Sequence, residues 1–203
     1  LEKVTDANDN DTDLGYNDRA QLVSITNAEN ETTTFDYDDN NRLNKIIHDA
    51  DDSEINIEYD LAGRRTSVTD ENGNETTYSY DGAYRLTGIT DALSHTTAFG
   101  YDIMSNMTSQ TDALGNVTNY EYDGFNRLKK IKHPLPSPSA SPRLEESFTY
   151  NQLGELASHT DTAGHTTEYR WFYWNNNRYL EIKDELENFT YLTYNRRLQM
   201  TQV

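Results

Sequence analysis

Apolar and polar residues alternate along several short stretches of the chain. Thr76, Tyr78 and Tyr80 fall on one face of an extended strand, and the polar residues between them fall on the other face. The stretches 55–59 and 118–122 alternate in the same way. Because the side chains of a β-strand point to opposite faces with a period of two, this pattern predicts short β-strands.

The strand pattern recurs with a period of 21 residues. An aromatic residue before a polar turn marks each unit, and successive markers are 21, 22, 21, 21, 21, 28, 21 and 23 residues apart. Apolar residues recur six and nine positions after the marker, as at Leu86 and Ile89. The marker aromatics are Tyr16, Tyr37, Tyr59, Tyr80, Tyr101, Tyr122, Tyr150, Trp171 and Tyr194. With Asp, Asn and Gly in the turns, each unit is predicted to form a β-hairpin in one antiparallel sheet.

The longer gaps locate insertions in an otherwise continuous array of about nine units over residues 1–203. The largest insertion, in residues 133–146, contains all four prolines of the chain. Proline cannot donate a hydrogen bond to a sheet, so this segment is predicted to be an inserted loop. Two extra residues lie in 174–177, and one lies near 48–54. The repeat pattern runs to both ends without a capping unit, so we expect a segment of a longer protein.

The composition is unusually polar and acidic, which bears on whether the chain folds and on the kind of sheet it forms. Hydrophobic residues make up only 34% of the chain, and the net charge is −18, values that are typical of disorder. The 15 tyrosines and the strict period instead favour a single-layer sheet with water on both faces. The acidic balance argues against nucleic acid as a partner, and no apolar run is long enough for a membrane span.

The repeated unit resembles the YD repeat of Rhs (rearrangement hotspot) proteins. The most regular copies are GNETTYSYDGAYRLTGITD (73–91) and GNVTNYEYDGFNRLKKIKH (115–133). Related repeats occur in bacterial polymorphic toxins, in the B and C components of Tc toxins, in wall-associated bacterial proteins and in teneurins. The resemblance implies an all-β spiralling sheet that forms a hollow shell, in a secreted or cell-surface bacterial protein. It also implies that the shell of the parent protein encapsulates or presents a C-terminal toxin, although no toxin segment is implied for this chain itself.

Self-cleavage is not implied for this chain. Bacterial relatives often end the shell with a motif resembling D-P-x-G, whereas the four prolines here follow His133, Leu135, Ser137 and Ser141. We therefore expect a non-catalytic shell segment without a cofactor. Its expected partners are the rest of the parent shell and an enclosed toxin polypeptide. The alternative function is an adhesive array, wall-associated or teneurin-like, that binds carbohydrate or a protein.

The most aromatic stretch, 168–181, is the candidate for such a ligand patch. The predicted patch consists of Trp171, Tyr173 and Trp174, and packing within the sheet is the competing interpretation. Trp171 replaces the usual tyrosine and Phe172 the usual aspartate, which predicts a local irregularity such as a β-bulge.

Metal binding is not predicted, although two groups of residues suggest it. Asp9, Asp11 and Asp13 alternate as in a calcium loop, but glycine comes one place late, and Ala20 stands where a bidentate glutamate is expected. A second group of His159, His165 and Asp161 lacks a fourth ligand.

Two recurrent polar residues have structural interpretations. An arginine recurs five positions after the marker, and we expect it to pair with the aspartate of a neighbouring hairpin. Its copies are Arg42, Arg64, Arg85, Arg127 and, after the two-residue insertion, Arg178. Glycosylation sequons occur at Asn30, Asn74, Asn106, Asn116 and Asn188. We interpret these asparagines as parts of turns and strands.

Overall fold

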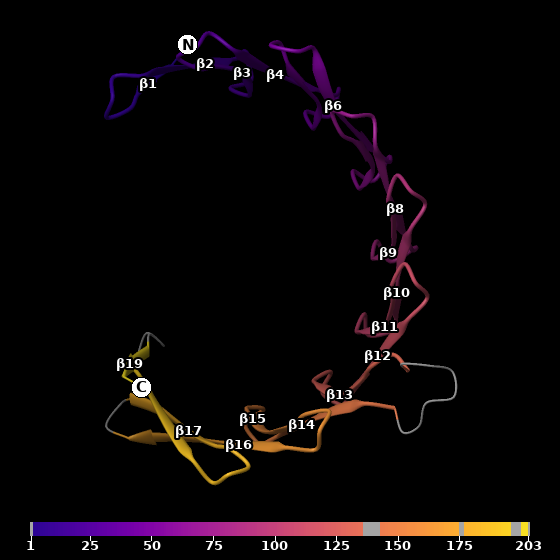
Figure 1. The fold of residues 1–203 in the computed structure, drawn as a ribbon, viewed down its shortest axis with the longest axis vertical. Helices are drawn as coiled ribbons and strands as arrows, with labels where there is room; N and C mark the ends of the chain where they lie inside the picture. Colours follow the sequence, from indigo (N-terminus) through magenta and orange to yellow (C-terminus); the bar gives the residue numbers. More distant parts are fainter. Residues whose placement is uncertain (1, 136–142, 175–176, 196–199, 203) are drawn as a thin grey trace. The chain divides into compact units, whose positions relative to one another are not determined.

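The structure, a computed structural model, describes residues 2–135, 143–174, 177–195 and 200–202 (Figure 1). In these residues it contains nineteen β-strands and no helix, which confirms the predicted all-β class. The strands are β1 (Glu2–Thr5), β2 (Asp11–Tyr16), β3 (Leu22–Thr26), β4 (Thr32–Tyr37), β5 (Leu43–His48), β6 (Ser53–Tyr59), β7 (Arg65–Thr69), β8 (Glu75–Tyr80), β9 (Leu86–Thr90), β10 (Thr96–Tyr101), β11 (Met107–Thr111), β12 (Val117–Tyr122), β13 (Leu128–Lys132), β14 (Glu145–Tyr150), β15 (Leu156–Thr160), β16 (Thr166–Trp174), β17 (Asn177–Lys183), β18 (Phe189–Tyr194) and β19 (Met200–Gln202).

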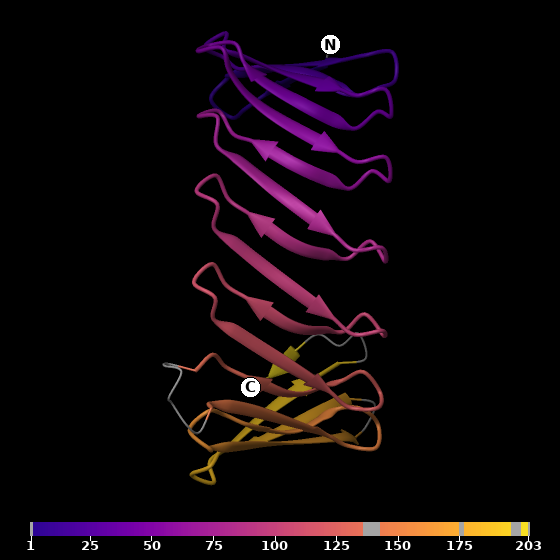
Figure 2. The same ribbon diagram turned by 90° about the vertical axis from the view of Figure 1, so that its right-hand side faces the viewer.

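The chain divides into two compact units, Leu1–Thr97 (unit 1) and Ala98–Val203 (unit 2). Within each unit, every strand pairs antiparallel with the next strand along the chain, from β1 to β9 and from β10 to β19. The strands lie side by side in a single layer (Figure 2). This arrangement confirms the predicted single-layer sheet of repeated hairpins.

A β-bulge recurs beside the marker aromatic. Tyr80 pairs with Leu86, but its neighbour Ser79 pairs with Gly88, so one extra residue, Thr87, lies on β9 between these pairs. Eight hairpins show this shift between the marker and the residue before it. The extra residue changes the alternation of faces, as β-bulges do. An apolar residue six positions after the marker and another nine positions after it therefore face the same side.

A β-bulge was expected at Trp171 and Phe172, but this hairpin has none. The hairpin of β16 and β17 pairs without a shift over seven residue pairs, from Glu168 with Lys183 to Trp174 with Asn177. At this marker the strands pair in a regular ladder, whereas eight other hairpins have a bulge beside the marker. The prediction of a bulge at this position was therefore wrong.

One turn design closes both ends of the hairpins. In the turn after Tyr80, the Asp81 side chain accepts hydrogen bonds from the backbone of Ala83 and Arg85. The backbone N–H of Tyr84 donates to the Asp81 carbonyl at 3.1 Å, and Tyr84 has a φ of 65°. Asp, Asn and Gly suit such turns because their side chains bond locally or because they tolerate positive φ.

The inserted loop is shorter than the predicted segment 133–146. Strand β13 ends at Lys132 and β14 begins at Glu145, so Glu145 and Glu146 belong to a strand. The backbone N–H of His133 donates to the Leu144 carbonyl at 2.9 Å and extends the pairing of the two strands. Residues 136–142, which hold three of the four prolines, lie outside the described residues.

The sheet has almost no closed core. Among the described residues, Leu180 is the buried hydrophobic side chain, with 6% of its surface exposed, and Ser67 is the buried polar one. Most strand residues are half-buried; in β8 they alternate with exposed residues, as the period of two requires. Stability must therefore come from the backbone ladder and from contacts between adjacent hairpins.

Candidate binding surfaces

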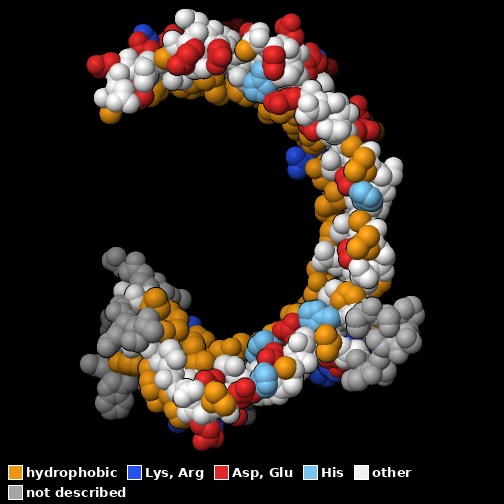
Figure 3. All heavy atoms as spheres, viewed as in Figure 1, with side chains coloured by type: hydrophobic (Ala, Val, Ile, Leu, Met, Phe, Trp, Pro, Cys, Tyr) orange, Lys and Arg blue, Asp and Glu red, His pale blue; other side chains and the backbone are white. Residues whose placement is uncertain are grey.

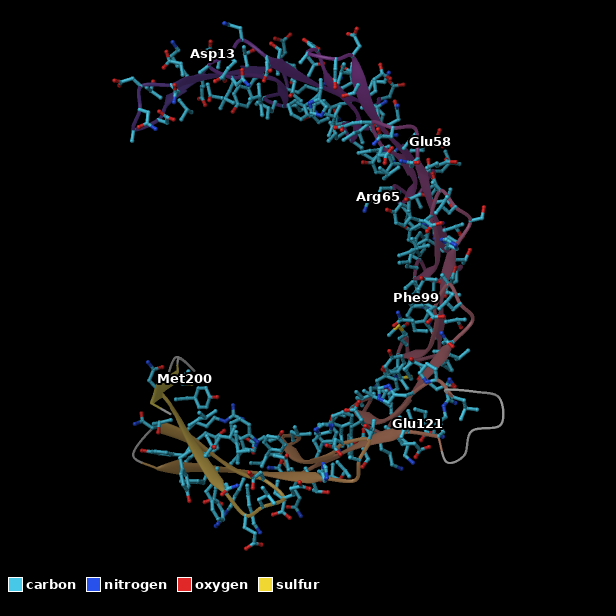
Figure 4. All side chains as sticks on the ribbon, viewed as in Figure 1. Asp13, Glu58, Arg65, Phe99, Glu121 and Met200 are labelled. Atoms are coloured by element: carbon cyan, nitrogen blue, oxygen red, sulfur yellow. The ribbon has the colours of Figure 1, made fainter. Side chains whose placement is uncertain are left out.

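The two faces of each unit differ in chemistry. In unit 1, Arg65 points to the concave side of the sheet, whereas Asp13 and Glu58 point to the convex side (Figure 4). In unit 2, Phe99 points to the concave side and Glu121 to the convex side (Figure 4). Hydrophobic side chains gather on the concave face of each unit, and most acidic side chains of unit 1 lie on its convex face and turns (Figure 3).

The pairing register explains why the marker aromatics share the concave face. Tyr59 lies opposite Arg65, and Ile57 lies opposite Val68, so these residues share the face of Arg65. Glu58 stands between Ile57 and Tyr59 and points the other way. Each marker ends its strand except Trp171, which lies within β16.

The marker hydroxyls connect successive hairpins. In five of the hairpins the marker hydroxyl donates a hydrogen bond to the backbone carbonyl of the residue six positions after the preceding marker. Tyr59 Oη donates to the Leu43 carbonyl at 2.8 Å, and Trp171 replaces the hydroxyl with its indole Nε1, which donates to the Leu156 carbonyl at 3.1 Å. The same bond is made by Tyr37 to Leu22, Tyr80 to Arg65, Tyr122 to Met107 and Tyr150 to Leu128.

The recurrent arginine also connects hairpins, but through other atoms than expected. Arg42 Nε donates to Asp38 Oδ2 at 2.7 Å in its own turn, not to the aspartate side chain of a neighbouring hairpin. Its guanidinium lies 4.5 Å from the centre of the Tyr59 ring, and its Nη1 donates to the Asp60 carbonyl at 3.2 Å. Arg64 and Arg127 repeat the ion pair and the stacking on the next marker. We call this arrangement the arginine clamp.

The turn aspartates are held ionised by their hydrogen bonds. The Arg42 side chain and backbone donors lower the pKa of Asp38. In the opposite turn after β7 an asparagine stands in place of the arginine, and the Asn74 side chain and backbone lower the pKa of Asp70. The sequon asparagines whose side-chain amides donate to a turn aspartate are Asn74, Asn106, Asn116 and Asn188. Asn30 instead occupies a turn position with a φ of 65°.

The predicted ligand patch is only partly available as a surface. The Trp171 ring is half-buried and lies 3.9 Å from the Arg178 guanidinium, in addition to its bond to the Leu156 carbonyl. Tyr173 is 63% exposed, and its hydroxyl lies 3.4 Å from Glu155 Oε1. The side chain of Trp174 lies outside the described residues. Trp171 thus has structural contacts, and Tyr173 is the open member of the patch.

A second group of aromatic residues occupies the convex face of unit 2. Phe172 stacks on Tyr179 at 5.2 Å, and Phe189 stacks on Tyr191 at 6.2 Å between ring centres. These four residues belong to β16, β17 and β18, on the face opposite Trp171. Sequence reasoning missed this group, although Phe189 and Tyr191 stand at strand positions where most other repeats have polar residues.

Two histidines and a glutamate meet on the concave face of unit 2. His133 Nε2 lies 2.7 Å from Glu146 Oε1, and His159 Nε2 lies 2.8 Å from Glu146 Oε2. An ionised carboxylate only accepts hydrogen bonds, so both imidazoles donate. The bonds from His159 and His133 lower the pKa of Glu146. The His159 ring also stacks on Phe148 at 4.7 Å. We call these three titratable residues the histidine–glutamate cluster.

The first candidate metal group is not assembled by the fold. Asp11 accepts hydrogen bonds from Lys3 Nζ at 2.7 Å and Thr5 Oγ1 at 2.6 Å, Asp13 points to the convex side, and Asp9 lies in a turn with a φ of 62°.

In the second group, His165 Nδ1 lies 3.2 Å from Asp161, while His159 faces Glu146. Within the described part of the chain, no group of three or more His, Asp or Glu side chains has the arrangement of a metal site. The same residues include no helix that could cross a membrane.

Comparisons with known proteins place these features in a family. The family described as RHS Repeat matches residues 16–54, 59–96, 85–116 and 105–135, more than half of the chain. Comparison with curated proteins gives no match.

Similar solved structures include TcdB2–TccC3 without its hypervariable C-terminal region, at 17% identity and a TM-score of 0.47, covering 95% of this chain and 10% of that chain. The Tc holotoxin pore of Photorhabdus luminescens matches at 14% identity and a TM-score of 0.42, covering 94% of this chain and 14% of that chain. A porin-like protein from Bacteroides uniformis matches at 14% identity and a TM-score of 0.36, covering 91% of this chain and 87% of that chain. The chain thus spans 10% to 14% of the two Tc toxin chains. By its matched repeats, the chain belongs to the RHS repeat family.

Proposed function

We propose that the chain is a non-catalytic wall segment of a secreted RHS-repeat shell that encloses a polypeptide payload, such as a toxin. The observation that carries this proposal is the difference between the two faces of a single-layer sheet (Figure 3). The concave face presents aromatic and aliphatic side chains that are only half-buried, such as Ile57 and Tyr78.

The chemistry of the faces suits enclosure. An unfolded polypeptide exposes apolar groups, and covering an apolar surface is favourable by about 25 cal/mol per Å². The concave face offers such surface on half-buried side chains. The backbone ladder makes the wall a steric barrier, and the acidic groups of the convex face favour solubility. The partners in this proposal are the rest of the parent shell and the payload.

The chain has no cysteine, so single cysteines can report on each face separately. We would place one at Phe99, on the concave face, and one at Glu121, on the convex face (Figure 4). The labelling rate of each thiol is then measured with and without an unstructured, apolar-rich peptide. Enclosure predicts slower labelling at position 99 and no change at position 121. Equal protection at both positions, or none at either, would contradict the proposal.

A second candidate function is carbohydrate binding by an adhesive array, favoured by the 63% exposure of Tyr173. Exposed aromatic rings are suitable surfaces for the apolar faces of ligands. A glycan array would test it: saturable binding that is lost in Tyr173→Ala and Trp174→Ala, but kept in Tyr191→Ala, would support this function. Trp171→Ala is unsuitable as a test because its indole holds two hairpins together.

A further inference from the structure

The histidine–glutamate cluster departs from the repeat at three positions. Glu146 stands four residues before a marker, where Thr33, Thr76, Thr97, Thr118 and Thr167 stand in other units. His159 stands nine residues after a marker, where Ile25, Ile46, Ile89 and Ile131 stand in other units. His133 stands where a turn aspartate or asparagine is usual. A carboxylate and an imidazole therefore replace a hydroxyl and an aliphatic group at Glu146 and His159, and at His133 an imidazole replaces a turn aspartate or asparagine.

The pairing register places the cluster on the concave face. Glu146 lies opposite Ile131, which in turn lies opposite Tyr120. Tyr120 is next to Glu121, whose side chain points to the convex side (Figure 4). The two imidazole–carboxylate bonds join three adjacent strands, since His133 follows β13, Glu146 is in β14, and His159 is in β15. The cluster thus belongs to the surface that would face a payload.

The titratable and charged groups on the strands next to the cluster do not include another group that changes charge between pH 5 and 8 on this face, among the described residues. The titratable groups on this face are Tyr120 and Tyr122 from β12, Tyr150 from β14 and Tyr169 from β16. On β15, Asp161 is occupied by its own turn and by His165. Arg143 contacts the backbone carbonyls of His133 and Val117.

Two of the three lysines of β13, Lys130 and Lys132, point to the opposite face. Lys130 pairs with Glu145, and Lys132 pairs with Glu121. Tyrosine is in general uncharged in the mildly acidic range. Beside the constant positive charge of Arg143, the change of charge at this place on acidification is therefore set by the two imidazoles.

We propose that the histidine–glutamate cluster makes payload contact depend on pH, because its own charge on the concave face of unit 2 reverses on acidification. With both imidazoles neutral the cluster carries one negative charge, and with both protonated it carries one positive charge. Imidazole is the side chain that changes charge between pH 5 and 8. The preferred contact at low pH is then an acidic polypeptide segment. This inference rests on the proposed function of the concave face.

The test compares two unstructured peptides of equal length and apolar content, one with glutamates and one with lysines at its charged positions. Their affinities for the 203-residue chain are measured at pH 7.5 and pH 5.5 by fluorescence anisotropy. We expect the affinity for the glutamate peptide, relative to the lysine peptide, to rise about fivefold on acidification, as for two weak surface ion pairs. The variant His133→Asn/Glu146→Thr/His159→Ile restores the ordinary repeat residues and should lose the rise.

A control variant, His95→Asn/His165→Asn, removes two histidines that pair with aspartates in exposed turns and should keep the rise. If the wild type binds both peptides but its preference does not change with pH, or changes equally in the triple variant, the inference fails while enclosure stands. If neither peptide binds at either pH, the enclosure proposal fails, and this inference fails with it.

Histidine NMR signals give a readout that needs no peptide. At a fixed pH, Glu146→Gln should move the imidazole chemical shifts of His133 and His159, because both rings lose their carboxylate partner, and should leave those of His95 and His165 unchanged. Unchanged chemical shifts at all four positions would show that the cluster does not form in solution and would overturn the inference.

Discussion

The guanidinium of Arg127 lies 4.4 Å from the centre of the Tyr150 ring. The arginine of this clamp thus stacks on the marker aromatic of the next hairpin. Its Nε also donates to Asp123 Oδ2 at 2.8 Å, in its own turn. A rigid, planar group can make both contacts at once, whereas a lysine ammonium cannot. A lysine could also form the ion pair at this position, but it could not stack on the ring at the same time. The clamp therefore explains why arginine, and not lysine, recurs five positions after the marker.

Replacing Arg127 by lysine should lower the free energy of unfolding by about 1 kcal/mol, because the stacking and the forked hydrogen bonds are lost while the charge remains. Urea titration followed by circular dichroism would measure the loss. Arg19→Lys is the control: Arg19 is exposed, and its side chain donates to Asn41 alone among the contacts described, so its loss should stay within about 0.5 kcal/mol. Equal losses would show that the clamp adds nothing beyond charge.

Replacing Tyr122 by phenylalanine should cost about 1 kcal/mol, because the Met107 carbonyl loses the hydroxyl that donates to it at 3.0 Å. The matched control is Tyr84→Phe, in a turn where the ring is 66% exposed and the hydroxyl has water available. Chemical denaturation of both variants would compare them. A loss in Tyr84→Phe as large as that in Tyr122→Phe would contradict a linking role for the marker hydroxyl.

Acid should destabilise the fold through its turns. The pKa of Asp81 is lowered by the backbone and side chain of Arg85, and that of Asp112 by the side chain and backbone of Asn116, both below the usual 3.8. A carboxyl whose pKa is depressed by folding stabilises the native state above its unfolded pKa, and this stability is lost as pH falls through the folded pKa. The melting temperature should therefore hold from pH 7 to about pH 5 and fall below about pH 4.

The variant Asp112→Asn should lose less stability between pH 7 and pH 3 than the wild type, since one titrating turn has been removed. Its melting temperature at pH 7 should be lower from the start. A variant that loses as much on acidification as the wild type would show that other groups govern the acid transition.

Backbone conformation predicts opposite effects for two similar substitutions. Ala20 has a φ of 59°, which costs an L-residue about 1 kcal/mol, so Ala20→Gly should raise the melting temperature. Gly63 occupies the equivalent position of a later turn with a φ of 85°, so Gly63→Ala should lower it. Differential scanning calorimetry would measure both. Shifts of the same sign would mean that the turns adopt other conformations in solution.

The hairpins could be predicted because their signals are local and repeat many times. Asp81 and Arg85 specify a turn within five residues, and each copy of the pattern repeats the same information. The bulge also left a signal that was not used: Leu86 and Ile89 are three residues apart, which a regular strand cannot place on one face. At β16 and β17 the sequence departs from the repeat, and the structure departs with it.

Contacts between hairpins could not be predicted as well, because they depend on register. The partner of Arg42 is its own Asp38, four residues away, a spacing visible in the sequence once the turn geometry is known. His133, Glu146 and His159 are separated by an insertion of unrelated sequence, so their meeting needed the pairing of β13 with β14. Tryptophan always carries an indole N–H, but that the Leu156 carbonyl accepts it depends on the position of Trp171 in the ladder.

The arginine clamp reaches one hairpin ahead and no further, and this has a consequence for how such a chain can change during evolution. Excision of residues 60–80 would remove 21 residues and join Tyr59 to Asp81. Asp81 and Arg85 would then take the places of Asp60 and Arg64, and Arg42 would still stack on Tyr59. Whole periods can thus be lost or duplicated by recombination without a compensating change elsewhere, so the length of the protein is free to vary between lineages in steps of one hairpin.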